Sequence, residues 1–303
     1  MNSRVLVIGA ISMIFALITF NDLVGDWGRL EGGWSNLEKF FEESLWPPNW
    51  SVLEAQSYPV CQEGVGLFCS VAWMGMIETI KIAFVSTAFG FVIALPLAAF
   101  AANNLSPKWV SFPSRVILSA MRSLPSIIWA ILFVIIFDIG TLAGIFAMTF
   151  YTVGYLGKLQ FESIEGIRNA PLEAARAMGM TRAETTYLVA IPESANNLLS
   201  HMMFMFEYNV RHGTVIGLVG AGGIGLYLNT YLKMLQYDKV VALLIIVFAV
   251  VVLIDMLSMI IRSKFTEEGD VQRPSWSTIF LPAKMASLHH HGKFIQQVDD
   301  SEE

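Results

Sequence analysis

Long apolar stretches, separated by short polar segments, run along most of the chain. The clearest is Val240–Ile261, in which Asp255 is the single charged side chain. An α-helix needs roughly 20 apolar residues to cross the hydrocarbon core of a membrane. Four further stretches are also long and apolar, namely Val5–Phe20, Met74–Ala101, Arg115–Phe137 and Thr141–Gly157. A sixth candidate, Thr186–Arg211, is much more polar. The pattern predicts an all-α integral membrane protein with about six transmembrane helices.

The polar segments divide the chain into four parts. We expect an N-terminal transmembrane anchor in residues 1–20, an extracytoplasmic Trp-rich segment in 21–73, the main transmembrane domain in 74–262 and a cytoplasmic tail in 263–303. Residues 1–20 could instead be a cleaved signal peptide, but no good small-residue cleavage site precedes Asn21. No cysteine or carboxylate stands at ligand spacing beside His289–His291, so no metal site is predicted.

Composition and charge agree with a membrane protein and indicate its orientation. Hydrophobic residues make up 55% of the chain and charged residues 15%, whereas soluble domains have about 25% charged residues. With six crossings and the N-terminus inside, the inner segments carry 13 Lys and Arg, and the outer segments carry 5, Arg211 among them. Basic residues favour the cytoplasmic side. The sequence therefore predicts both termini in the cytoplasm.

The two cysteines, Cys61 and Cys69, both fall in the predicted outer segment. In an oxidising compartment they could close a short loop as a disulfide. Two unpaired thiols are the alternative.

A polar island within residues 160–190 has its own helix signals. Pro171 suits the first turn of a helix, and Gly179 suits the left-handed residue that follows a helix. Thr181 and Glu184 have the spacing of a capping box, which begins a helix. We expect two short helices that meet at a glycine. Such an island is either a solvated connector or a knob that fits a partner's groove.

The glycine-rich segment 213–225 contains Gly220-x-Gly222-x-x-Gly225, the spacing of a dinucleotide fingerprint. The acidic residue that should follow a second strand is missing, and no βαβ unit of about 30 residues fits between two membrane spans. No Gly-x-x-x-x-Gly-Lys-Ser/Thr loop occurs either, so the chain is not expected to bind ATP. Gly220, Gly222 and Gly223 instead indicate close backbone approach and non-helical turns buried within protein.

Polar side chains recur at intervals of three or four residues between Glu193 and Arg211, which places them on one side of a helix. Such a stripe in a membrane should face protein or a water-filled path. Glu207 and Arg211, four residues apart, could simply pair. Arg122 could contact an anion or extend to the inner surface. We find no paired acid and base, so no catalytic residue is predicted.

The island Leu172–Pro192 resembles the coupling loop of ABC-importer permease subunits. In that loop Glu-Ala-Ala is followed after six residues by Gly and then by Ile-x-Leu-Pro; here Glu173–Ala175, Gly179 and Val189–Pro192 keep this spacing. The runs Ala120–Val134, Gly154–Leu159 and Phe206–Gly225 resemble the permease subunit of phosphonate importers. The Gly-Ala-Gly-Gly element within the last run also occurs in methionine-type permeases, whereas the long outer segment before Met74 departs from the family.

The resemblance implies a methionine/phosphonate permease-like domain in a prokaryotic cytoplasmic (inner) membrane. It implies a homodimer that works with a cytoplasmic ABC ATPase dimer, where ATP and Mg are bound, and with an extracytoplasmic substrate-binding protein. The chain itself would bind no cofactor and no nucleic acid. The implied cargo is a phosphonate or a related oxyanion such as phosphite or a phosphate ester; methionine or another small solute is the alternative.

The resemblance also implies roles for particular residues. The ATPase-coupling residues would be Glu173, Ala174, Ala175, Gly179 and Pro192, and the translocation path would include Arg122, Asn197, His201, Glu207, Arg211, Gly220, Gly222 and Gly223. Two rival classes remain. A membrane enzyme would need a paired acid and base or metal ligands on one face, and a secondary transporter would lack the inner knob and run without ATP.

Overall fold

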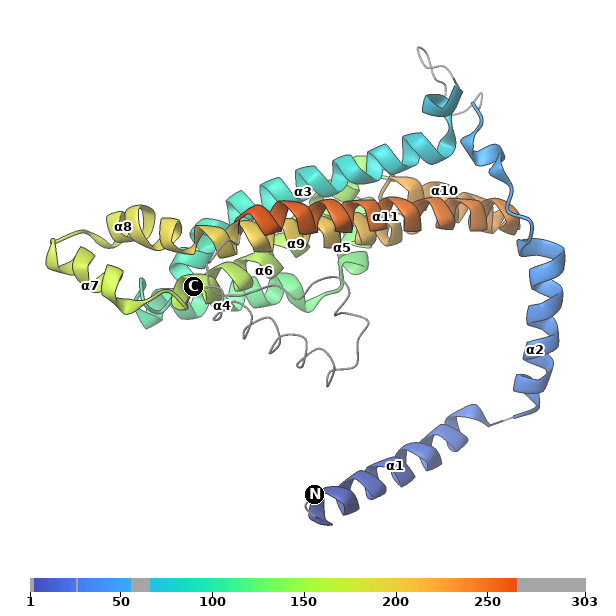
Figure 1. Ribbon diagram of the computed structural model, residues 1–303, viewed down its shortest axis with the longest axis horizontal. Coiled ribbons are helices and arrows are strands. Elements are labelled where there is room, and N and C mark those ends of the chain that lie inside the picture. The colour runs from blue at the N-terminus through green and yellow to red at the C-terminus, as the bar shows by residue number, and fades with distance from the viewer. Residues whose placement is uncertain (1–2, 26, 56–65, 266–303) are drawn as a thin grey trace, which may run out of the picture. The chain divides into compact units, whose positions relative to one another are not determined.

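The computed structural model describes residues 3–25, 27–55 and 66–265, and within these residues helices and short turns make up the fold, with one isolated β-bridge (Figure 1). The α-helices are α1 (Ser3–Val24), α2 (Gly28–Phe40), α3 (Val71–Ala101), α4 (Lys108–Ser123), α5 (Ser126–Phe137), α6 (Thr141–Glu165), α7 (Asn169–Ala177), α8 (Arg182–Thr185), α9 (Ile191–Gly217), α10 (Ile224–Lys233) and α11 (Tyr237–Phe265). The predicted all-α class is confirmed. His289–His291 lie outside the described residues.

Four of the described helices are long and apolar enough to cross a membrane. They are Leu6–Val24 within α1, α3, α6 and Tyr237–Arg262 within α11; α4 and α5 together form a possible fifth span, bent by 84°. The stretch Arg115–Phe137, predicted as one span, is therefore divided between two helices. Leu124 has extended backbone angles, because the ring of Pro125 disfavours the helical conformation of the residue before it.

The predicted polar span over Thr186–Arg211 has different limits in the structure. Thr186–Ala190 is a π-helical turn (η4), and α9 follows it without a break and continues to Gly217. Pro192 lies in the first turn of α9, and the π-helical turn η4 ends at Ala190, directly before α9 begins. The 27-residue α9 has the length of a span, yet it is too polar to count among the four apolar ones. The predicted number of six spans is thus not confirmed.

The bundle is centred on α3 and α6, and α9 lies against both (Figure 1). Small residues allow these helices to approach closely, as is common in membranes. A Cβ atom added at Gly154 of α6 would lie 2.8 Å from the backbone nitrogen of Arg122 in α4. A Cβ added at Gly213 of α9 would lie 2.8 Å from Cγ2 of Thr79 in α3. The glycines therefore set the helix spacing around α6 and α9.

Part of the predicted Trp-rich outer segment is fixed to the bundle. The side chain of Asn49 donates a hydrogen bond to the Asp238 carboxylate at 2.8 Å, and its backbone N–H donates to the Asp238 carbonyl at 3.1 Å. Val52 is fully buried in a cluster with α3, α10 and α11. Cys69, at the end of a 3₁₀ turn (η3, Gly66–Cys69), is disulfide-bonded, and Cys61 lies outside the described residues.

Candidate coupling element and translocation face

The corner between α7 and α8 is closed by a Schellman motif. Gly179 has φ = +76°, a left-handed conformation that glycine adopts without a Cβ penalty. Its N–H donates to the carbonyl of Arg176 at 3.0 Å, and the N–H of Met180 donates to the carbonyl of Ala175 at 3.1 Å. These are the two bonds that define this helix ending. The prediction that two short helices meet at Gly179 is confirmed.

The helix after the corner begins with the predicted capping box. The Glu184 N–H donates to the Thr181 hydroxyl at 3.3 Å, and the Thr181 N–H donates to the Glu184 carboxylate at 2.7 Å. The backbone and hydroxyl hydrogen bonds from Thr181 lower the pKa of the Glu184 carboxyl. The box is therefore formed at neutral pH and weakens only as the pH falls through that lowered value.

The structure separates the predicted coupling residues into outward-facing and inward-facing ones. Glu173 and Ala174 are exposed on α7, whereas Ala175 is fully buried. Ala175, predicted with Ala174 as a coupling residue, packs inward like Leu172 three residues before it and does not form part of the exposed surface. Met178, at the corner, is 69% exposed. This large apolar side chain was not singled out in the sequence, and it makes the corner a candidate contact surface.

One face of α9 joins α6 in a polar and aromatic stripe. His201 Nε2 lies 3.0 Å from the Ser163 hydroxyl, and the hydroxyls of Tyr151 and Tyr208 are 2.9 Å apart. The ring of His212 stacks on Tyr208 with centroids 3.8 Å apart. All five side chains are partly exposed, and Asn197, near the start of α9, is exposed. We call the residues Asn197, His201, Tyr208, His212, Tyr151 and Ser163 the α6–α9 face.

A second face of α9 carries ion pairs to α11. Arg211 bonds to Glu207 at 2.5 Å and to Asp255 at 2.6 Å, and Arg262 reaches Glu207 at 3.1 Å. The pairing of Glu207 with Arg211 is confirmed. Two expectations need correction: Arg211 lies within α9 rather than in an outer segment, and the predicted single polar stripe is two faces. A helix turns by about 100° per residue, so Glu207 and Tyr208 point to different neighbours.

The centre of the bundle holds a buried amide, Asn209, that was not among the predicted site residues. Asn209 is fully buried and its side-chain amide donates to the hydroxyls of Thr87 at 2.9 Å and Thr152 at 3.0 Å. It thereby links α9 to α3 and α6. Its two partners stand 122 and 57 positions away in the sequence, so no local pattern indicated this contact.

The glycine-rich segment forms a buried turn between α9 and α10. Gly220, Gly222 and Gly223 have φ of +96°, +81° and +70°. The Thr79 hydroxyl of α3 accepts the N–H of Ile224 at 2.9 Å, and the Gly140 N–H donates to the Gly220 carbonyl at 2.9 Å. The non-helical turn predicted from these glycines is present, and Thr79 and Gly140 satisfy two of its backbone groups, as a buried turn in a membrane requires.

Arg122 lies in the last turn of α4 and is partly buried. No ion pair of Arg122 occurs among the described residues. The role of Arg122 in the translocation path therefore stays a prediction.

Long apolar helices, a buried glycine turn and a polar helix face within the bundle are typical of membrane transport subunits. The chain belongs to the family described as "Binding-protein-dependent transport system inner membrane component", whose model matches residues 94–267. This family consists of ABC-importer permeases and not of enzymes, so the chain is an inner-membrane permease component. Such a permease works with an ATPase and a substrate-binding protein.

Several known proteins that are similar to the chain are named as components of transport systems. It is 38% identical over 191 residues to the phosphite transport system permease protein PtxC of Stutzerimonas stutzeri, a match that covers 63% of this chain and 70% of that protein. It is 37% identical over 182 residues to the putative phosphite transport system permease protein HtxC of the same organism, covering 60% of this chain and 64% of that one. An inward-facing structure of the MetNI methionine ABC transporter matches with a TM-score of 0.58 and 26% identity over 65% of this chain and 96% of that chain.

Proposed function

We propose that this permease imports phosphite or a closely related phosphorus oxyanion such as a phosphonate. The observation that carries the proposal is the 38% identity to a protein named as a phosphite permease, against 26% to the methionine transporter whose fold it shares. Methionine or another small solute is the second candidate, because the Gly-Ala-Gly-Gly element also occurs in methionine-type permeases and the chain shares the fold of the methionine transporter.

The α6–α9 face is the part of the translocation path that would meet the anion. It offers neutral hydrogen-bond donors in the hydroxyls of Tyr151 and Tyr208, and the imidazole rings of His201 and His212 lie on the same face. A polar face of a helix at membrane depth has to border protein or a water-filled path. Neutral donors would hold an oxyanion briefly without trapping it, since charge-assisted bonds are roughly twice as strong. In a homodimer two such faces would border one path.

The α7–α8 corner is the coupling element of this proposal. Glu173, Ala174 and Met178 are exposed there and would enter a groove on the ATPase. The corner is held by the Schellman motif and the capping box, so movement of the ATPase would reach η4 and α9 along one continuous helix. We infer that the corner and both chain termini lie on the cytoplasmic side, where the ATPase would bind. The excess of Lys and Arg in the predicted inner segments supports this orientation.

Growth on defined phosphorus sources tests the cargo. Cells without this chain should fail to grow on phosphite or a phosphonate as sole phosphorus source and should grow normally on phosphate. Wild-type protein should restore growth, and Tyr208→Phe, which removes one hydroxyl and keeps the ring, should restore it only partly. Loss of methionine uptake with normal growth on phosphite would favour the second candidate.

A further inference from the structure

Two adjoining cavities lie where the α3–α4 loop meets α7, α8 and η4. One has a volume of about 400 Å³ and a polar lining, and the other has about 660 Å³ and an apolar lining. They share the loop residues Leu105, Ser106 and Pro107 and the side chain of Arg182. A single molecule with a polar head and an apolar tail could therefore occupy both.

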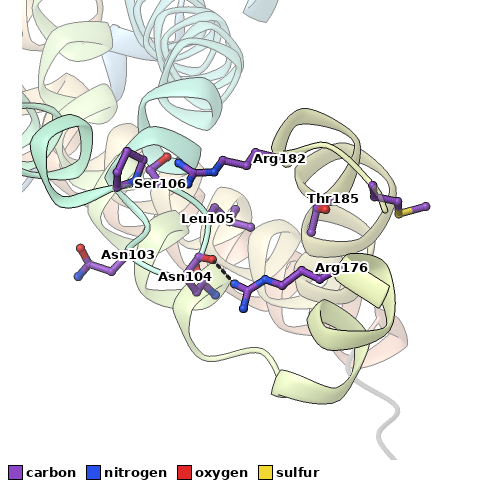
Figure 2. A pocket seen from close by; sticks show the side chains of 9 residues that line it. Asn103, Asn104, Leu105, Ser106, Arg176, Arg182 and Thr185 are labelled. Carbon is purple, nitrogen blue, oxygen red and sulfur yellow. Dashed lines mark hydrogen bonds between the residues drawn. The ribbon is translucent and has the colours of Figure 1, made fainter. Parts of the chain in front are cut away.

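The polar cavity offers positive charge. Arg176 and Arg182 extend from the α7–α8 side toward the loop Asn103–Pro107 (Figure 2). Arg176 donates one hydrogen bond to the carbonyl of Asn104 at 3.1 Å, and no ion pair of either arginine occurs among the described residues. None of the described residues that line either cavity is a carboxylate. Guanidinium groups bind phosphate in a fork geometry.

The apolar cavity lies at the end of α3, among exposed apolar and aromatic side chains. Its wall is formed by Pro96 and Phe100 of α3, Trp109 of α4 and Tyr187 of η4. Trp109 is 80% exposed and Tyr187 73% exposed, and Trp and Tyr rings favour the membrane–water interface. Further along α3, a candidate span, the large apolar side chains of Phe89 and Val92 are also exposed. The groove thus opens at the end of a membrane-crossing helix.

We propose that this pair of cavities binds one anionic phospholipid, with an acyl chain in the apolar groove and the headgroup phosphate between Arg182 and Arg176. Both volumes fall within the range of specific small-molecule sites, about 300–1,000 Å³. The lipid would connect the α7–α8 corner, α4 and the end of α3 to the bilayer. Lipid charge would then act directly on the elements that meet the ATPase.

Native mass spectrometry of the full chain in complex with its ATPase tests this site. The complex should retain added phosphatidylglycerol in preference to phosphatidylcholine. Each arginine near an anionic lipid contributes roughly a fivefold gain in affinity, so Arg182→Gln should weaken retention about fivefold and the double variant with Arg176→Gln about thirtyfold. Arg168→Gln is the matched control, because Arg168 is exposed on the same island and lines neither cavity.

A second variant tests the binding of the lipid's acyl chain and leaves both arginines in place. Ala183→Trp places a large ring in the apolar groove from an exposed position, and it should reduce phosphatidylglycerol retention while the complex stays assembled. Equal retention of the two lipids, or a double arginine variant that binds like wild type, would overturn the proposal. So would equal binding of inorganic phosphate or glycerol phosphate in place of the lipid, which would mark a free-anion site.

Discussion

Replacement of Gly179 by valine should uncouple this permease from its ATPase. Gly179 has φ = +76°, and no heavy atom lies within 4 Å of a Cβ added there. The cost of a side chain is therefore conformational and not a clash with neighbours. An L-residue in the left-handed region loses about 1–2 kcal/mol, and a β-branched residue belongs at the upper end. The ratio of intact to disrupted α7–α8 corner should fall about 5–30-fold.

The assay is ATP-driven uptake in membrane vesicles at limiting ATPase, with equal amounts of permease shown by immunoblot. Gly179→Val should insert normally, retain less ATPase on purification and transport more slowly by up to that factor. Gly179→Asn is the matched control, because asparagine tolerates the left-handed conformation. Normal uptake by the valine variant would refute the reasoning. An asparagine variant as defective as the valine one would show that a contact at Gly179, rather than its conformation, matters.

Three further outcomes are expected. Asn209→Leu removes two hydrogen bonds between helices, each worth roughly 0.6 kcal/mol in membranes, so thermal unfolding in detergent should show a loss of about 1 kcal/mol; an unchanged midpoint would contradict this. Gly144→Ala drives a Cβ into the carbonyl of Ala221 and should cost about 1–3 kcal/mol in the same assay, whereas Gly32→Ala meets nothing within 4 Å and should be tolerated. After reduction, a membrane-impermeant maleimide should label Cys69 on intact cells, and labelling only after permeabilisation would reverse the proposed orientation.

The features that could be predicted from the sequence are those specified by neighbouring residues. The Val240–Ile261 run is helical and apolar by itself, and α11 contains it. Thr181 and Glu184 are three residues apart, so the capping box is local information, as is the glycine that ends α7. Leu172 and Ala175 share the buried side of α7 at a three-residue spacing, a pattern that could have shown Ala175 to face inward.

The features that were missed depend on partners far apart in the chain. The Tyr151–Tyr208 contact joins residues 57 positions apart, and Arg211 meets Asp255 across 44 positions. No periodicity within α9 indicates which of its polar sides meets α6 and which meets α11. The bend at Pro125 is different, because the proline is visible within the predicted span. The span was predicted from its apolar residues alone. The effect of Pro125 on the backbone of Leu124, which ends the first helix, was not taken into account.

The central claim is that the chain carries a phosphorus oxyanion across the inner membrane under the control of an ATPase. The most direct test is uptake of radiolabelled phosphite into vesicles that contain the permease, its ATPase and its binding protein. We expect uptake that requires ATP, is unaffected by excess methionine and is slowed by Gly179→Val. Uptake of phosphite without ATP, or competition by methionine in place of phosphonates, would contradict it.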